Sequence, residues 1–278
     1  MGTETKMIIL KKVEKNVYKI CQNLPIILKN EATKKIKKIV KLDSNEEIRL
    51  LSYFFYCSLP PKQQKKISLS LIIDLGTANL WLWAALEIFD DLLDDEDNRD
   101  ELPIGIFAFC TFEETINKII KDNGMLRELW QNKKQAMLNA NLYERKYLRG
   151  QKRKRPDFSK LSDRSFLHVF GPIILLNKIN YSTKNLIKSL EKYLTIRQKL
   201  DDIYDCQTDL AKGHLNYANW LQSQLSYNEY RNKIIRLKKS WLQEMKSAED
   251  KIQPFFLKTF FSKISATIVE NLDSSTKL

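Results

Sequence analysis

Cysteine and histidine are scarce in this chain of 278 residues, which carries four cysteines and two histidines. The cysteines stand far apart and none belongs to a CxxC pair; they are Cys21, Cys57, Cys110 and Cys206. Zinc sites and disulfide scaffolds need cysteines or histidines at characteristic spacings, so both are disfavoured. We therefore expect reduced thiols and a cytoplasmic protein.

Glycine and proline are also few, with seven of each. Helix formers such as lysine, leucine, glutamate and glutamine abound, so the sequence predicts an all-α fold. A hydrophobic content of 43% is enough for a buried core. No repeat, low-complexity linker or composition break divides the chain, which predicts a single domain over residues 1–278.

Long apolar runs are missing as well. No uninterrupted stretch approaches the roughly 18 apolar residues of a membrane span, and the run at residues 7–10 is too short for a signal peptide. We expect a soluble protein with, at most, peripheral membrane contact.

What the chain does have is helical periodicity. Residues 67–90 are apolar nearly all round, as expected of a helix in the middle of a bundle, whereas residues 186–205 are amphipathic. Apolar residues recur at helical spacing over ten segments: residues 6–29, 31–42, 45–58, 63–96, 103–121, 123–149, 160–179, 183–210, 215–223 and 227–266.

Two aspartate clusters of one pattern each end an apolar helical segment. They are Asp90-Asp91-Leu92-Leu93-Asp94 and Asp201-Asp202-Ile203-Tyr204-Asp205. Residues four apart share a helix face, so each cluster aims two carboxylates the same way. Such like-charge pairs cost about 0.2–0.5 kcal/mol each, and carboxylate oxygens suit hard cations. The clusters predict a site of three magnesium ions for a diphosphate, formed where two core helices face one another across a bundle.

The net charge of +13 favours anionic partners such as diphosphates, nucleic acid or acidic lipid surfaces. Basic residues concentrate at residues 34–41 and 146–155, although a solvated lysine-rich surface would look the same. No nucleic-acid fold signature accompanies the basic residues, so nucleic-acid binding is not expected.

The stretch AALEIFDDLLDDED (residues 84–97) resembles the first aspartate-rich motif of the trans-isoprenyl diphosphate synthases, or polyprenyl synthetases. QKLDDIYDCQTDLAKG (residues 198–213) resembles their second motif, and Arg164-Ser165 stands where that family has a Lys-Thr pair that contacts diphosphate. The resemblance covers about residues 45–222. It implies an isoprenoid-synthase-type helical bundle with a central active-site cavity, in the class I superfamily.

The resemblance also implies a role for individual residues. Asp90, Asp94 and Asp201 would be the leading magnesium ligands, supported by Asp91, Asp202 and Asp205. The diphosphate contacts would be Arg164, Lys199, Arg99, Arg49 and Lys212, and the prenyl pocket would include Ala85, Leu86, Leu82, Trp83 and Gln198. Three magnesium ions would neutralise the leaving group of an allylic prenyl diphosphate, so that its C–O bond ionises in a dry cavity. The resemblance leaves open which acceptor receives the prenyl group and whether the protein forms a homodimer.

Most of the basic residues with which the family binds the second, acceptor diphosphate are missing from this chain. The family's Gly-Gly-Lys-Arg-x-Arg-Pro run corresponds here to Asn45-Glu46-Glu47-Ile48-Arg49, which keeps only Arg49. The paired arginines after the first motif are reduced to Arg99, and the Gly-Lys after the second motif is replaced by Gly213-His214. The DDxxD form of the second motif favours prenyl transfer to an acceptor, whereas the eroded basic run favours cyclisation by a terpene synthase. Non-enzymatic binding of a lipid diphosphate is the third alternative.

Two other metal sites are disfavoured. An EF-hand loop starting at Asp94 would have Arg99 in place of its glycine and Gly105 in place of its last glutamate. A di-iron bundle needs a glutamate three residues before each histidine, and neither His168 nor His214 has one. We expect His168, on an apolar face, to be a hydrogen-bonded packing residue.

Overall fold

The structure is a computed structural model that describes residues 3–43, 46–93, 99–148 and 155–250. Every element within these residues is a helix, which confirms the all-α prediction. The chain forms two compact units: unit 1 comprises Met1–Trp130 and His168–Ser182, and unit 2 comprises Gln131–Leu167 and Thr183–Leu278. The expectation of one domain over the whole chain stays a prediction.

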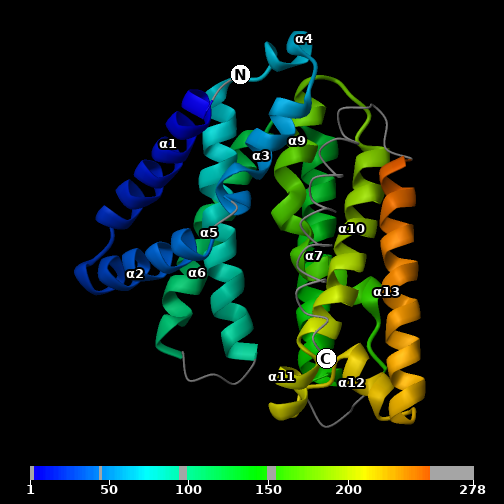
Figure 1. The fold of residues 1–278 in the computed structure, drawn as a ribbon. Helices are drawn as coiled ribbons and strands as arrows, with labels where there is room; N and C mark the ends of the chain where they lie inside the picture. The colour runs from blue at the N-terminus through cyan, green and yellow to red at the C-terminus, as the bar shows by residue number, and fades with distance from the viewer. Residues whose placement is uncertain (1–2, 44–45, 94–98, 149–154, 251–278) are drawn as a thin grey trace. The chain divides into compact units, whose positions relative to one another are not determined.

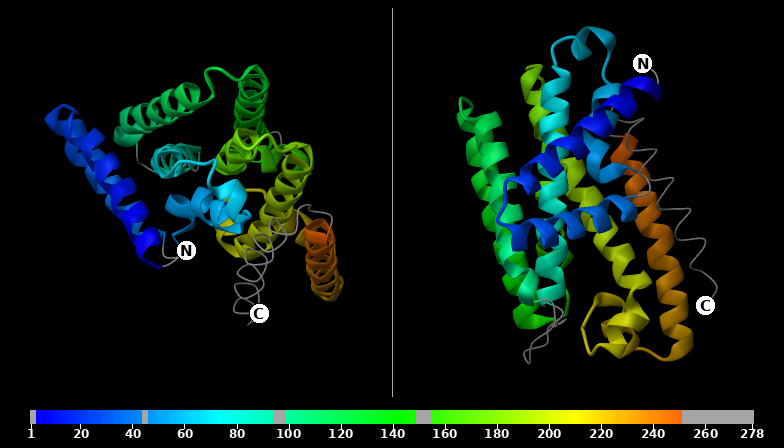
Figure 2. Two further views of the ribbon diagram at one scale, coloured as in Figure 1. Left: turned by 90° about the horizontal axis from the view of Figure 1, so that it is seen from above. Right: turned by 90° about the vertical axis from the view of Figure 1, so that its left-hand side faces the viewer.

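Helix α5 (Leu69–Leu93) is the centre of unit 1, as its apolar sequence predicts. Figure 1 shows α5 beside α6, and in the right-hand view of Figure 2 α1 and α2 cross in front of it. The other helices of unit 1 are α1 (Thr3–Gln22), α2 (Ile26–Leu42), α3 (Glu47–Ser58), α4 (Pro61–Gln64), the 3₁₀ helix η1 (Arg99–Glu101), α6 (Leu102–Ile120), the first turns of α7 (Gly124–Tyr147), and α9 (Phe170–Lys178).

Small residues let the helices of unit 1 approach α5 closely. A Cβ placed on Gly76 of α5 would lie 2.5 Å from the carbonyl oxygen of Arg49 and 2.9 Å from Val13 Cγ2. On the other side of α5, a Cβ on Gly105 of α6 would lie 2.9 Å from Ile88 Cγ2. These glycines set how near α3 and α6 can come to the central helix.

The first predicted helix, over residues 6–29, is wrong in its continuity. The structure ends α1 at Gln22 and begins α2 at Ile26, with Pro25 as the N-cap residue. Proline has no N–H to continue the helix and disfavours the helical conformation at Leu24 before it. The break turns the chain back on itself, so that α1 and α2 both pack on α5.

Unit 2 is organised around α10 (Lys184–Tyr204), which packs on α8, α11, α12 and α13. Figure 1 shows α10 and α13 side by side. Unit 2 also contains the rest of α7, together with α8 (Phe158–Leu161), most of the 3₁₀ helix η2 (Ser162–Val169), α11 (Cys206–Ala211), α12 (Tyr217–Gln222) and α13 (Tyr227–Asp250). The predicted helix over residues 160–179 is wrong in its continuity, because α8, η2 and α9 share that stretch.

The predicted helix over residues 183–210 is interrupted at Asp205, which ends α10 and begins α11. Gly213 then adopts a left-handed conformation with φ of +73°, and the N–H of His214 donates to the carbonyl of Asp209 at 2.8 Å. This is a glycine-terminated helix end of the usual kind. Asn216 caps α12 reciprocally with Asn219, so the chain after the second aspartate cluster folds into a tight turn.

Residues 69–92 of α5 are long and apolar enough to cross a membrane by length and composition alone. Of the window that meets this criterion, 67% is buried inside the protein. A buried core helix passes the same test, and the packing of α5 against four neighbours accounts for its composition.

The close approach at Gly76 predicts a large effect of one methyl group. We expect Gly76→Ala to lower the free energy of unfolding by about 1–3 kcal/mol, because the new Cβ meets backbone atoms of α3 that cannot move aside locally. Gly124→Ala is the matched control, since its Cβ meets nothing within 4 Å, and it should be neutral or stabilising by up to about 1 kcal/mol. Urea denaturation followed by circular dichroism measures both. A Gly76→Ala protein as stable as the wild type would contradict the packing.

Candidate functional site

The second aspartate cluster lies at the C-terminal end of α10. Asp201 and Asp205 are both exposed, and the N–H of Asp205 donates to the carbonyl of Asp201 at 2.8 Å. The helical spacing therefore continues through Asp205, although α10 formally ends at Tyr204. The two carboxylates share one face of α10, as predicted.

The charges of two arginines affect the pKa of Asp201. The surrounding protein raises the pKa of Asp201 by desolvation even though its surface is exposed, while the charges of Arg197 and Arg164 lower it. Arg164 is the residue predicted to contact diphosphate, so the structure brings it into the electrostatic surroundings of Asp201. Sequence reasoning missed Arg197, whose signal was its position one helical turn before Asp201.

Arg164 is held in place by helix α7. It forms an ion pair with the buried Glu144, while its neighbour Asp163 lies 3.6 Å from Lys133 Nζ. Lys133 and Glu144 are three turns apart on one face of α7, so two adjacent residues of η2 are fixed to one helix face. Lys133 Nζ also lies 2.8 Å from Glu191 of α10. These ion pairs position Arg164 relative to α10.

Asp202 points into unit 2 and not along the Asp201 face. It is 5% exposed, its Oδ1 accepts from Gln198 Nε2 at 2.9 Å, and its Oδ2 accepts from the backbone N–H of Tyr217 at 2.8 Å. Its pKa is raised to about 7, mainly by burial and further by the charges of Asp209 and Asp201. The two hydrogen bonds lower the pKa but do not offset these effects. Asp202 thus ties α10 to the start of α12. Its role as a supporting ligand, and that of Gln198 in a prenyl pocket, stay predictions.

Two predicted diphosphate contacts lie away from Asp201. Lys199 is two residues from Asp201, hence about 200° around the helix. Its ammonium lies 5.3 Å from the ring centroid of Trp241 and 5.7 Å from that of Phe158. Lys212 is exposed at the C-terminal end of α11. The structure does not bring Lys199 together with Asp201, and the diphosphate role of both lysines stays a prediction.

The first aspartate cluster ends α5 in unit 1, where Asp90 is exposed and Asp91 is half-buried. Lys35 of α2 is 4% exposed, and its Nζ lies 3.4 Å from Asp91, 3.4 Å from Glu87 and 2.9 Å from Glu101. Glu87 and Asp91 are four residues apart on α5, so both face this lysine. The structure thus gives Asp91 an internal partner that the sequence did not reveal.

Burial lowers the pKa of Lys35, but its hydrogen bond to Glu101 and the charges of Glu87, Glu101 and Asp91 outweigh burial and raise it. Lys35 therefore stays charged at neutral pH. Lys38 adds a second cation 2.8 Å from Glu87. Asp90, about 100° around the helix from Asp91, is left on the exposed side of α5.

Arg49 is engaged inside unit 1. It is 8% exposed, its Nε donates to Asp43 Oδ2 at 2.8 Å, its Nη2 donates to the Asp43 carbonyl, and its Nη1 pairs with Glu14. This cluster fixes the start of α3 against α1. A diphosphate would have to displace two carboxylates to reach the guanidinium.

The residues predicted to line a prenyl pocket pack inside unit 1. Leu82 and Ala85 have no exposed surface, and Leu86 is half-buried. Trp83 stacks on His168 with ring centroids 4.5 Å apart, and His168 Nδ1 lies 2.8 Å from Asn79 Oδ1. The prediction that His168 is a hydrogen-bonded packing residue is confirmed. A pocket at these positions stays a prediction.

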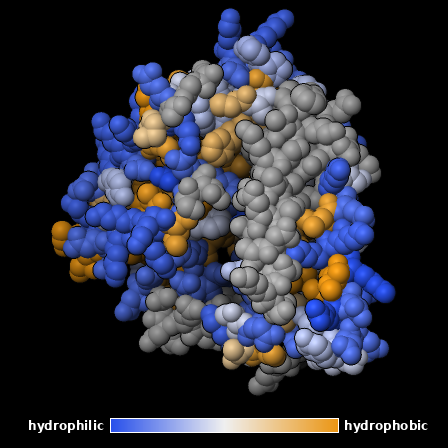
Figure 3. Space-filling view, in the orientation of Figure 1, coloured by the Kyte–Doolittle hydropathy of each residue, from blue (hydrophilic) through white to orange (hydrophobic). Residues whose placement is uncertain are grey.

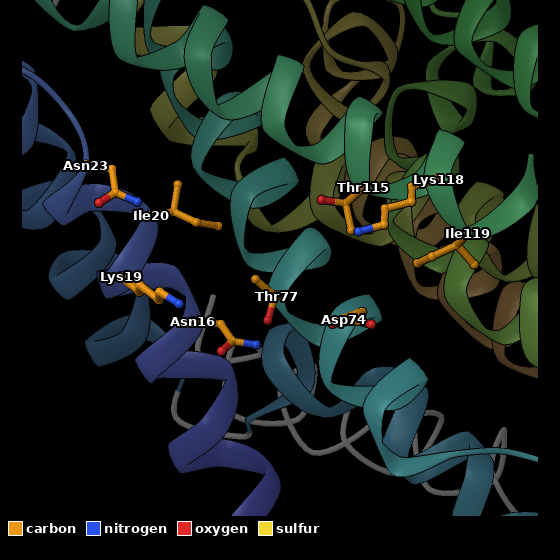
Figure 4. Close-up of a pocket in the computed structure, with 9 residues that line it drawn as sticks. All are labelled: Asn16, Lys19, Ile20, Asn23, Asp74, Thr77, Thr115, Lys118 and Ile119. Carbon is orange, nitrogen blue, oxygen red and sulfur yellow. The ribbon is translucent and has the colours of Figure 1, made fainter.

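One cavity of about 520 Å³ lies elsewhere in unit 1 (Figure 4), between α1 and α6 with α5 as its floor. Asp74 and Thr77 of α5 form the floor, with Lys19 and Lys118 on opposite sides. Asp74 is 16 residues before Asp90, or about 24 Å along the helix. This cavity is therefore separate from the first aspartate cluster.

The described residues contain no ready-made group of three acidic, histidine or cysteine side chains that could hold a metal ion. Asp94 and the side chain of Arg99 lie outside the described part of the chain. The exposed carboxylates of Asp90, Asp201 and Asp205 nonetheless offer oxygen ligands of the kind magnesium prefers. Magnesium is often held by one or two carboxylates together with substrate phosphates and water, so these residues fit it.

Comparison with models of known protein families finds no match for this chain, and comparison with curated proteins finds none either.

Asp202 predicts a pH dependence of stability. Because its pKa is about 7 in the fold and 3.8 ordinarily, the unfolded chain releases this proton first. Wild-type stability should therefore fall, relative to Asp202→Asn, as the pH rises from about 4 to about 7. Urea titrations in EDTA over this range measure the difference.

Asp202→Ala provides the matched comparison. It leaves the buried N–H of Tyr217 without its acceptor, which should cost about 1–3 kcal/mol relative to Asp202→Asn. An Asn variant whose stability differs from that of the wild type by the same amount at pH 4 and pH 8 would refute the buried titrating carboxyl.

Proposed function

We propose that this protein is a magnesium-dependent enzyme that ionises an allylic prenyl diphosphate and transfers the prenyl cation to an acceptor. The proposal includes an isoprenoid-synthase-type bundle with a central cavity, in which both aspartate clusters bind one diphosphate through three magnesium ions. It rests on the sequence resemblance together with the local geometry of each cluster.

The observation that carries the proposal is the set of charges around Asp201. Asp201 and Asp205 share one helix face, and Arg164 and Arg197 lower the pKa of Asp201 against the effect of desolvation. Carboxylates for metal ions and guanidinium groups for phosphate oxygens thus occur together in one place. A solvated helix end would not need Arg164 fixed by an ion pair to the buried Glu144.

The residues have distinct tasks in this proposal. Asp90 and Asp94 of the first cluster, with Asp201 and Asp205 of the second, would hold the metal ions, while Arg164 would bind phosphate oxygens. Magnesium supplies electrostatic stabilisation of the charge that develops on the leaving group. The allylic C–O bond breaks, and its electron pair leaves with the diphosphate. The allylic cation then alkylates a double bond of the acceptor, and the resulting carbocation loses a proton to the released diphosphate, which leaves an alkene in the product.

A second candidate, cyclisation without an acceptor, is favoured by one observation. Arg49 is the only retained member of the basic run that holds the second diphosphate in the resembling family, and here it is engaged by Asp43 and Glu14. A terpene synthase would need no second diphosphate site, since the cation would be attacked by a double bond of its own chain.

The test is a product analysis. Purified protein and magnesium are incubated with geranyl, farnesyl or geranylgeranyl diphosphate, each with and without isopentenyl diphosphate. Longer prenyl diphosphates support transfer, and cyclic hydrocarbons or alcohols support cyclisation. Tight binding without turnover would indicate a diphosphate-lipid-binding protein, and neither binding nor turnover would refute the proposal.

Both clusters should be essential. We expect Asp90→Ala and Asp201→Ala each to lower kcat by on the order of a thousandfold, comparable to removing a major electrostatic stabiliser, and EDTA to abolish turnover. Asp74→Asn is the matched control because Asp74 lies about 24 Å along α5 from Asp90. Near wild-type turnover in either cluster variant would disprove a shared diphosphate site.

Isopentenyl diphosphate should bind weakly. Each missing charge-assisted contact forfeits about 1.5–3 kcal/mol, and the guanidinium of Arg49 already has two carboxylate partners. We expect no saturation below millimolar concentration in calorimetry, with the allylic substrate as the positive control. Micromolar affinity would show that another set of residues forms an acceptor site.

A further inference from the structure

The outer surface of α2 carries the most exposed isoleucines of the described chain together with a row of lysines. Ile26 is 67% exposed and Ile27 is 76% exposed. Both lie at the first turn of α2, directly after the break at Pro25. Burying either side chain in an apolar medium would be favourable by about 1.5–3 kcal/mol.

Helical geometry places the lysines on the same side as the isoleucines. At 100° per residue, one sector about 100° wide contains residues that are all exposed; they are Ile26, Ile27, Asn30, Lys34, Lys37 and Lys41, which we call the α2 strip. The opposite sector contains Ala32, Lys35, Ile36 and Ile39, all buried against the rest of unit 1. The inward face of α2 therefore makes the packing contacts with unit 1, and the α2 strip does not contribute to them.

Positive charge predominates around the strip, although Glu31 of α2 lies 3.9 Å from Lys34 Nζ. Residues 3–43, which form α1 and α2, contain eleven lysines and four acidic residues, and so supply more than half of the net charge of +13. In Figure 3 apolar surface lies at the left edge, where Figure 1 shows the turn between α1 and α2, with hydrophilic surface around it. An apolar tip with a cationic flank matches the interface of a bilayer that contains anionic lipids.

We propose that the α2 strip docks this protein on anionic membranes, with Ile26 and Ile27 inserted below the phosphates and Lys34, Lys37 and Lys41 paired with them. A nucleic acid would satisfy the lysines but would leave two adjacent isoleucines in water. A bilayer satisfies both, because its phosphates lie directly above its hydrocarbon. The strip runs about 22 Å along the helix from Ile26 to Lys41, so it can lie along the membrane plane.

Vesicle co-sedimentation of the full-length protein tests the proposal. We expect binding to phosphatidylcholine vesicles that contain phosphatidylserine, little binding to phosphatidylcholine alone, and weakening by salt. Ile26→Ser with Ile27→Ser should lower the partition coefficient at least tenfold. Lys34→Gln, Lys37→Gln and Lys41→Gln together should lower it by about a hundredfold, or about fivefold per lysine.

Ile235→Ser is the matched control, since Ile235 is 58% exposed on α13 and lies outside the strip. Circular dichroism should be unchanged in all variants, because every substituted side chain is exposed. The proposal is overturned if the wild type ignores phosphatidylserine, or if the isoleucine variant binds as well as the wild type. It is also overturned if the isoleucine variant only dissociates a dimer, or if the lysines bind RNA and not vesicles.

Discussion

A single buried ammonium group fixes much of unit 1. Removing a lysine from water costs several kcal/mol, and Lys35 is kept charged by Glu87 and Asp91 of α5 together with Glu101 of η1. The cation can be buried only if α2 lies across the end of α5 with this face inward. That constraint fixes the rotation of α2, and therefore determines which residues the opposite face exposes to solvent.

The same arrangement explains a division of labour within each aspartate cluster. Asp91 and Asp202, the second acid of each cluster, form contacts inside their own unit: Asp91 with Lys35, and Asp202 with Gln198 and the backbone of Tyr217. Asp90 and Asp201, the first acid of each, are exposed. Consecutive residues on a helix point about 100° apart, so one acid can hold the helix in place while its neighbour faces outward. Two adjacent aspartates need not have the same function.

The sequence predicted what depends on local pattern. The all-α class, the apolar helix α5, the shared face of Asp201 and Asp205, and the packing role of His168 all follow from spacing and composition. The partners of Lys35 do not follow from spacing or composition. Glu87 and Glu101 are more than fifty residues away in the sequence, and only tertiary packing brings them to α2.

Polar networks of this kind escaped prediction for the same reason. Arg49 was assigned to diphosphate from its position in a motif, yet its contacts with Asp43 and Glu14 depend on how α1 lies against α3. The cavity between α1 and α6 gave no sequence signal, since its walls come from three separate helices and form no motif. Pro25 is different, because it marks in the sequence the break within residues 6–29 that helical periodicity does not reveal.

The order of the two units along the chain has a consequence for how the protein is made. Unit 1 takes its last helix, α9, from His168–Ser182, after the chain has already entered unit 2 at Gln131. Phe170 of α9 packs edge-to-face on Trp130 with ring centroids 5.3 Å apart, and Gly171 lies directly against Ser52 of α3. During synthesis on the ribosome, unit 1 therefore cannot complete its core until residue 182 has emerged. Residues 131–167 emerge before the rest of unit 2 has been made. A fragment ending at Trp130 would lack part of its own core, so the two units cannot be separated by a single cut.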